Sequence, residues 1–441
     1  MNVSYKNIWQ MSYPILISML MQQLIGITDI IFLGRLGEIE LGASALGSTY
    51  FFTIFMVAFG FSVGAQIIMA RRNGEHHYEK VVQVFYQGCT FLVFSGFFFI
   101  ALSHIFTPTI LEYLIDSKEI YQATLKYINW RIWGIITASM VIMARSFFVS
   151  IIKTKVLTYV SIVMVLSNII LNYMLVFGKF SMPKLEIAGA ALASDLAEFI
   201  AVIFYIIYFI AKVDLDKYGL KKFVYKNFAL LKQILNLSIW TMLQQFISVS
   251  TWFLFFIAIE HLGERELAIS NIVRSLSSFP FVFVNAFAAT VSSLISNVIG
   301  EQKTDEVIPL CNKVLKICSI ITLPLLAVMA LAYYPLLRVY TDNINLLQES
   351  VSTYMIMLAG NAVFVPAWIF FNAVSGTGNT KRTMQIEFIS MIVYIIHVFL
   401  VIVYFKLPLA ICWTADAVYS MAILILSYIY MHSYKWCNKQ V

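Results

Sequence analysis

Leu36–Ser44 reads LGEIELGAS, and Leu262–Ser270, about half a chain further on, reads LGERELAIS. The two segments are identical at six of nine positions. Further dipeptides keep the same offset from them: Gly74-Glu75 with Gly300-Glu301, and Thr154-Lys155 with Thr380-Lys381. Matches that stay collinear over a whole half indicate that the chain is built from two homologous units.

The composition is that of an integral membrane protein. Hydrophobic residues make up 61% of the 441 residues and charged residues 12%, whereas soluble domains are about a quarter charged. Apolar runs of about 20 residues, long enough to cross a hydrocarbon core about 30 Å thick, recur along the chain. We therefore expect an all-α protein with twelve transmembrane spans, near residues 8–33, 44–70, 82–106, 128–152, 157–178, 187–211, 234–259, 270–299, 314–337, 351–375, 383–405 and 408–431.

Lysine and arginine are distributed as the positive-inside rule requires for a chain with both termini in the cytoplasm. In that orientation, nineteen of the 30 basic residues fall in cytoplasmic segments and eight in outer loops. The net charge of +7 is then a consequence of topology. Because the basic residues are scattered over separate loops, we expect the lipid bilayer and no nucleic acid as a partner.

The longest polar stretch, Ala211–Lys232, is dense in lysine and lies between the two repeats. We expect it to be a cytoplasmic linker between an N-lobe, residues 1–210 with helices 1–6, and a C-lobe, residues 233–441 with helices 7–12. Each lobe has an even number of spans, so the repeats are parallel. This architecture is typical of a transporter that rocks two lobes around a substrate cleft, here a monomer in the cell membrane, with the bacterial cytoplasmic membrane expected.

Polar residues at one depth in three spans of the first lobe predict an ion-coupling site. Placing an ionisable side chain inside the bilayer costs about 2.5–3.5 kcal/mol, so such a residue indicates a functional or structural role. Counted at about 1.5 Å per residue, four of these side chains lie roughly 9–12 Å from the outer ends of their helices: Asp29, Asn172, Ser194 and Asp195. Asn168 lies on the same helix face as Asn172. The predicted ion-coupling residues are Asp29, Asn168, Asn172, Ser194 and Asp195. The alternative is a set of separate hydrogen bonds between helices, which we favour for Asn168 and Ser194 taken singly.

The second lobe has different polar residues. Gln244 and Gln245 echo Gln22 and Gln23, and these four glutamines are candidates for lining a substrate cleft. For other polar residues we expect structural roles. Asp416 echoes Asp195, so both acids can be structural, and His397 is expected to be a packing residue. Glu387 lies near Lys381 and Arg382, which favours an interfacial ion pair. Aromatic residues such as Trp368 could contact flat cationic substrates.

No metal or cofactor is expected beyond a coupling ion, H⁺ or Na⁺. The five cysteines have no metal-ligand or disulfide spacing. His76 and His77 have no further ligand beside them, and no paired acids or nucleophile suggest a catalytic centre. An enzyme is therefore the least favoured function class.

Four segments in order resemble the multidrug and toxic compound extrusion (MATE) family. They are PILISMLMQQLIGITDIIFLGRLGEIELGASALG from Pro14, VGAQIIMARRNGEHHYEKV from Val63, SNIILNYMLVFGKFSMPKLEIAGAALAS from Ser167, and FNAVSGTGNTKRT from Phe371. The resemblance implies a cation-coupled antiporter that exports drugs and organic cations through two six-helix lobes. It implies that Asp29 is the ion-coupling carboxylate, that Asn168 lies near it, and that Pro14 is a bend point.

The chain departs from the family pattern in two ways. Asn172 occupies a position that holds aspartate in one branch of the family, and the acids that the NorM-like branch has in helices 7 and 10 are missing. Coupling would then depend chiefly on the first lobe. A lipid-linked saccharide flippase of the same superfamily is the alternative function.

Overall fold

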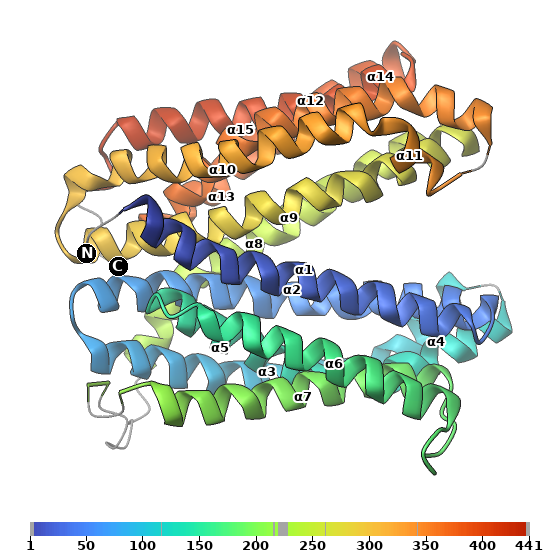
Figure 1. Cartoon of the computed structure of the whole chain (residues 1–441), viewed down its shortest axis with the longest axis horizontal. Helices are drawn as coiled ribbons and strands as arrows, with labels where there is room; N and C mark the ends of the chain where they lie inside the picture. Colours follow the sequence, from blue (N-terminus) through green and yellow to red (C-terminus); the bar gives the residue numbers. More distant parts are fainter. Residues whose placement is uncertain are drawn as a thin grey trace. The chain divides into compact units, whose positions relative to one another are not determined.

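The computed structural model describes residues 4–115, 117–214, 217–218, 228–260, 262–341 and 343–437. These residues form helices joined by turns, without strands, which confirms the all-α fold (Figure 1). In a bilayer the backbone must satisfy its own hydrogen bonds, and a helix does so within a single segment.

The described residues of the first half form α1 (Tyr5–Gly34), α2 (Glu38–Gly74), α3 (Tyr78–Leu114), α4 (Lys118–Arg131), α5 (Gly134–Ser150), α6 (Lys155–Phe177) and α7 (Ile187–Lys212). Those of the second half form α8 (Phe228–Glu260), α9 (Glu264–Gly300), the 3-10 turn η1 (Thr304–Glu306), α10 (Val307–Leu331), α11 (Tyr333–Arg338), α12 (Ile344–Gly376), α13 (Thr380–Val398), the π-helical η2 (Phe399–Tyr404), α14 (Leu409–Cys412) and α15 (Thr414–His432).

Eight of the twelve expected spans coincide with a single helix, and the other four, at 128–152, 314–337, 383–405 and 408–431, each cover two consecutive helices. Within the described residues, ten helices are long and apolar enough to cross a membrane, and α4 with α5 forms one more candidate that is bent by 51°. The expected span at 128–152 is thus broken, since α4 ends at Arg131 and α5 begins at Gly134. The number of spans and the orientation of the termini remain predictions.

The chain divides into two compact units. The N-unit contains Ile17–Asn73 and His77–Ser238, and the C-unit contains Met1–Leu16, Gly74–His76 and Ile239–Val441. Two helices therefore change unit along their length, α1 after Leu16 and α8 after Ser238. The lobe boundaries expected from the sequence stay a prediction, and the linker Ala211–Lys232 lies partly outside the described residues.

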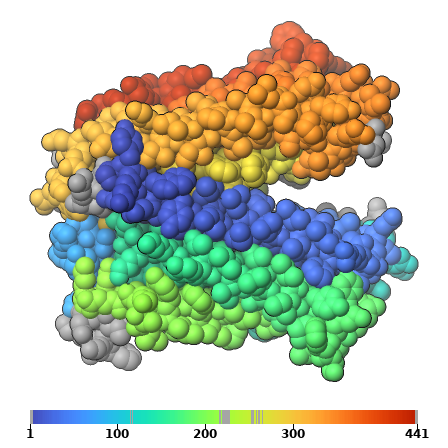
Figure 2. All heavy atoms as spheres, viewed as in Figure 1, coloured from blue at the N-terminus to red at the C-terminus, as the bar shows by residue number. Residues whose placement is uncertain are grey.

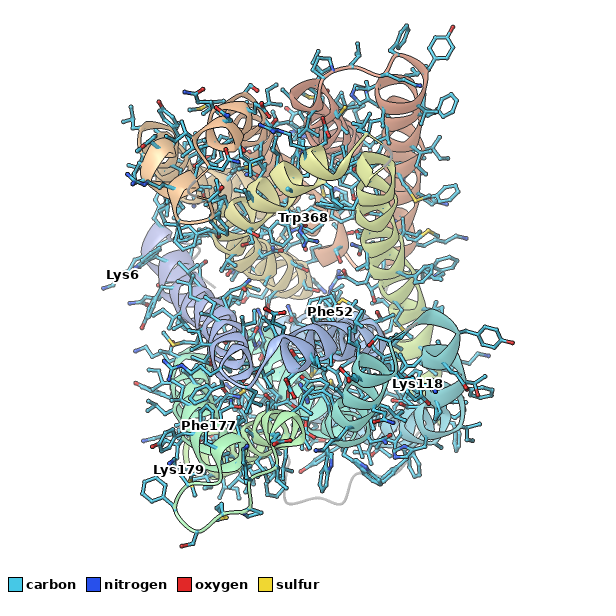
Figure 3. All side chains as sticks on the ribbon, turned by 90° about the vertical axis from the view of Figure 1, so that its right-hand side faces the viewer. Lys6, Phe52, Lys118, Phe177, Lys179 and Trp368 are labelled. Atoms are coloured by element: carbon cyan, nitrogen blue, oxygen red, sulfur yellow. The ribbon has the colours of Figure 1, made fainter. Side chains whose placement is uncertain are left out.

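Loops of the N-unit alternate between its two ends (Figure 1). α4 and the connection between α6 and α7 lie at the same end of this unit (Figure 1). Lys118 begins α4, and Lys179 lies in that connection; Figure 3 labels both. Both lysines belong to loops that the charge distribution assigns to the outer side of the membrane.

Candidate functional site

The site in the N-unit depends on the close packing of α6 against α7. A Cβ atom on Gly189 would lie 2.6 Å from the carbonyl oxygen of Leu175, so the helices approach at a point where only glycine fits. The neighbours Ala188, Ala190 and Ala191 are small and fully buried. Small residues let membrane helices pack backbone against backbone, and here they bring the polar residues of the two helices within hydrogen-bonding distance.

The carboxylate of Asp29 is held by both neighbouring helices. Its Oδ1 accepts hydrogen bonds from Asn172 Nδ2 at 2.7 Å and Asn168 Nδ2 at 3.3 Å, and its Oδ2 accepts one from Ser194 Oγ at 3.1 Å. In the space-filling view the blue surface of α1 lies against the green surface of α6 (Figure 2). Asp29 is therefore the point at which α1, α6 and α7 meet.

A second layer of hydrogen bonds joins the partners of Asp29 to one another. Asn172 Nδ2 also donates to Asn168 Oδ1 at 3.1 Å, and Asn168 Nδ2 donates to Ser194 Oγ at 3.2 Å. Thr28 Oγ1 donates to Asn168 Oδ1 at 3.3 Å. Thr28 was not among the predicted residues, although its place directly before Asp29 was a usable signal. The structure thus brings together four of the five predicted residues and adds this threonine.

One oxygen in this group has no partner. Asn172 is fully buried, and its Oδ1 makes no hydrogen bond. Buried polar atoms are nearly always paired, so an orphan acceptor beside a carboxylate needs an explanation. Carboxylate, amide and hydroxyl oxygens are the ligands that hard cations take in proteins. The group offers all three kinds: Asp29, Asn168, Asn172, Ser194 and Thr28.

The fifth predicted residue, Asp195, belongs to a different cluster. Its Oδ1 lies 2.5 Å from Arg131 Nη1, and Glu198 Oε1 lies 2.6 Å from Arg131 Nη2. Thr137 Oγ1 donates to Glu198 Oε2 at 3.1 Å. Consecutive residues of a helix point about 100° apart. Because Ser194 faces Asp29, Asp195 cannot face it as well, and depth counted from the sequence does not detect this difference.

The break between α4 and α5 makes room for this ion-pair cluster. A Cβ atom on Gly134 would overlap both Asp195 Oδ1 and Arg131 Nη1. The guanidinium carbon of Arg131 lies 3.6 Å from the ring centroid of Phe51, which covers its other face. One guanidinium between two carboxylates leaves one net negative charge. Arg131, the last residue of α4, was not among the predicted site residues.

The other predicted site residues are distributed over both units. Pro14 lies inside α1, which continues unbroken past it, and the bend there stays a prediction. Gln22 and Gln23 are exposed on the N-unit part of α1. Gln244 is buried and Gln245 half-buried on the C-unit part of α8. Their use as a substrate cleft also stays a prediction.

The interpretation of Glu387 as an interfacial ion pair is wrong. This residue is fully buried, and its Oε1 accepts hydrogen bonds from Ser248 Oγ at 2.5 Å and from the Tyr419 hydroxyl. Its side chain lies on the inward face of α13. The two basic residues expected to pair with it are engaged elsewhere.

Those two basic residues lie at the start of α13. Lys381 Nζ is 5.3 Å from the ring centroid of Trp240, and Arg382 Nη1 donates to Gln385 Oε1 at 3.1 Å. Long basic side chains near a helix end extend toward the interface, away from the buried face that carries Glu387.

The remaining polar residues of the C-unit include His397 and Asp416. His397 Nε2 lies 3.0 Å from Thr414 Oγ1, as expected for a packing histidine. Asp416 is partly buried on α15 and interacts electrostatically with Tyr394.

Comparison with known proteins identifies the family. The MatE family model matches residues 14–174 and 241–400, one match in each half of the chain. The chain belongs to the MatE family. Because the same model matches twice, the match agrees with the duplication seen in the repeated segments. With its series of apolar helices, this MatE chain is a multi-pass membrane protein.

Relatives of known name share low identity with the chain. A probable multidrug resistance protein NorM from Pasteurella multocida is 24% identical over 308 residues, which cover 69% of this chain and 66% of that protein. The chain thus spans just under two thirds of the length of that relative. A match to a probable multidrug resistance protein NorM from Photorhabdus laumondii covers 64% of the length of that protein. A match to NorM from Thermotoga maritima, 22% identical, covers 99% of this chain and 94% of the relative.

The fold is that of solved MATE structures. A multidrug resistance MATE family transporter of the MOP superfamily, solved in an outward-facing conformation, superimposes with a TM-score of 0.89 at 18% identity. The superposition covers 99% of this chain and 97% of that structure.

Proposed function

We propose that the protein is a cation-coupled antiporter that exports xenobiotic organic cations and amphiphiles by alternating access. Membership of the MatE family and the multidrug resistance names of its relatives support export. The observation that carries the coupling is the buried Asp29 group, in which three donors from α6 and α7 hold a carboxylate of α1 beside the unpartnered Asn172 Oδ1.

Loading a cation on Asp29 must rearrange this group. Its two oxygens face N–H and O–H donors, an arrangement suited to the ionised carboxylate. A proton on either oxygen would meet a donor that has to turn away, and a Na⁺ ion would require the asparagine amides to present their oxygens instead. In both cases the contacts of α1 with α6 and α7 change, so cation binding is linked to the packing of three helices.

The energy that such coupling provides is sufficient for export. One elementary charge that moves inward across 100 mV releases about 2.3 kcal/mol. That free energy supports roughly 50-fold accumulation of a neutral substrate outside. For a monovalent organic cation exchanged one for one, no net charge moves, so the concentration gradient of the coupling cation provides the free energy.

Aromatic side chains on α9 and α12 of the C-unit support the proposal that the substrates are flat and cationic. Phe281 stacks on Phe364 with ring centroids 5.3 Å apart, Phe364 on Trp368 at 5.1 Å, and Trp368 on Phe371 at 5.2 Å. Trp368, labelled in Figure 3, also donates from Nε1 to Asn285 Oδ1 at 2.8 Å, which fixes its ring. Fixed aromatic faces bind organic cations by cation–π attraction.

The proposal is tested by export from proteoliposomes that contain the purified full-length chain and a fluorescent organic cation. A pH gradient and a Na⁺ gradient are imposed separately, each with the membrane potential clamped. Export driven by one gradient and abolished when it is collapsed supports the proposal and names the ion. Export that ignores both gradients, or movement of lipid-linked saccharide without dye export, would contradict it.

A further inference from the structure

The C-unit contains a buried carboxyl group that the Asp29 site does not use. Glu387 lies on α13, seven residues after Thr380, or about 10 Å along the helix axis. Ser248 of α8 and Tyr419 of α15 each donate a hydroxyl hydrogen bond to the same oxygen, Oε1. Three helices therefore meet at Glu387, as three helices meet at Asp29 in the N-unit.

The second oxygen of this carboxyl has no partner. Glu387 Oε2 is buried without a hydrogen bond, and so is Ser390 Oγ, one helical turn further along the same face of α13. A buried, ionised carboxylate with one bare oxygen is costly. A neutral carboxylic acid fits the arrangement, since Oε1 is then the carbonyl acceptor of two donors and Oε2 carries the hydrogen.

No cationic side chain among the described residues pairs with Glu387. The titratable groups on the elements around it either contact other residues or are themselves acidic. They are Asp416 and Tyr394, which interact with each other, Tyr428 in ring contact with His432, Tyr430 hydrogen-bonded to Asn379, Tyr354 hydrogen-bonded to the Met329 carbonyl, and Glu349 paired with Arg265. Tyr419, its own donor, is the titratable group in direct contact. The site therefore lacks the counter-charge that would make Glu387 a structural ion pair.

We propose that Glu387 is a proton-binding carboxyl that loads and releases one H⁺ in each transport cycle, in addition to the cation carried by Asp29. The O–H bond forms at Oε2 with a proton from water and breaks when the proton returns to water on the other side. The part of this proposal that concerns the cycle rests on the proposed export function, whereas proton binding by Glu387 does not.

Infrared difference spectroscopy of the full-length protein in lipid nanodiscs tests proton binding directly. A pH titration should show the carbonyl band of a protonated carboxylic acid that is lost in Glu387→Gln and retained in the matched control Glu349→Gln, an exposed acid. Tyr419→Phe removes one donor to Oε1 and should shift the band to higher frequency without abolishing it. This variant keeps the test valid if Glu387→Gln fails to fold.

The proposal is overturned if Glu387→Gln leaves the set of carboxyl bands unchanged, if Tyr419→Phe moves none of them, or if Na⁺ at constant pH removes the band. These outcomes do not depend on export, so they remain informative even if the proposed function fails.

Transport stoichiometry tests the role in the cycle. With the membrane potential clamped at zero, each proton exchanged supports about tenfold accumulation for each pH unit of gradient. Glu387→Gln should therefore lower the limiting accumulation about tenfold, while Glu349→Gln leaves it unchanged. An unchanged limit in a folded Glu387→Gln variant would contradict a role in coupling.

Discussion

Asn172 Nδ2 donates to Asp29 Oδ1 at 2.7 Å, while the Oδ1 of the same asparagine side chain is buried without any partner. One end of the amide thus stabilises the negative charge, and the other end is free to contact a bound cation. The relation joins α6 to α1 at the residue that the proposed coupling requires.

Asp29→Asn should abolish gradient-driven export while the protein still inserts and folds. Asparagine preserves the size of the side chain but cannot lose or gain a charge. Dye efflux from cells and the amount of protein in the membrane are the measurements. Asp305→Asn, at an exposed position in η1, is the matched control and should retain normal efflux. Normal efflux in Asp29→Asn would remove this residue from the coupling mechanism.

Asn172→Ala should change the affinity of the site for the coupling cation: H⁺ should bind more tightly, because the ionised Asp29 loses a donor, and Na⁺ less tightly, because the Asn172 Oδ1 ligand is lost. A hydrogen bond to a charged group contributes about 1.5–3 kcal/mol, so the apparent affinity should change by roughly 10- to 150-fold. The cation concentration that gives half-maximal export measures the effect. Gln10→Ala, a substitution at an exposed position of α1 without a predicted role, is the comparison. If both variants have the affinity of the parent protein, Asn172 does not contact the coupling cation.

Arg131→Met should destabilise the N-unit strongly. Removing one partner of a buried ion pair leaves uncompensated charge and costs about 3–5 kcal/mol. In this case two acids, Asp195 and Glu198, would lose their counter-ion. Thermal unfolding in detergent measures the loss, and adding Asp195→Asn with Glu198→Gln should restore part of it. A stable single variant without that rescue would show that the cluster contributes little.

Gly189→Val should separate α6 from α7. The added side chain meets the Leu175 carbonyl, and overpacking of this kind costs about 1–3 kcal/mol. Both the unfolding temperature and export should fall, because the Asn168–Ser194 contact depends on this approach. Gly26→Ala adds a Cβ atom with no atom within 4 Å and should leave both unchanged. Equal behaviour of the two variants would mean that the close approach is unimportant.

The sequence predicted well how deep the site residues lie along their helices, but it predicted poorly the direction in which their side chains point. Counting residues from the helix ends placed Asp29, Asn172 and Ser194 at one level, and these side chains do meet. The same count included Asp195, whose direction around α7 is set by packing and takes it to Arg131. Rotation about a helix axis follows from close contacts such as the one at Gly189, which pattern alone does not specify.

Glu387 and the α4–α5 break were missed for related reasons. Nearness in sequence to Lys381 and Arg382 suggested an ion pair for Glu387, but its partners Ser248 and Tyr419 come from distant segments. The apolar run at 128–152 predicted one continuous span. The interruption lies beside a tertiary ion pair, between Arg131 and Asp195, that has no local signature.

The passage of α1 from one unit to the other gives this helix a mechanical role. Ser12, in its C-unit part, donates to Thr290 Oγ1 of α9 at 3.0 Å, and Asp29 lies 17 residues further on in the N-unit, about 25 Å along the same helix. An unbroken helix is stiff along its axis, so an axial displacement at one end also moves the other end. If cation loading displaces Asp29 along the axis, we expect Ser12 on the same helix to move with it, and Pro14 lies on α1 between these two residues.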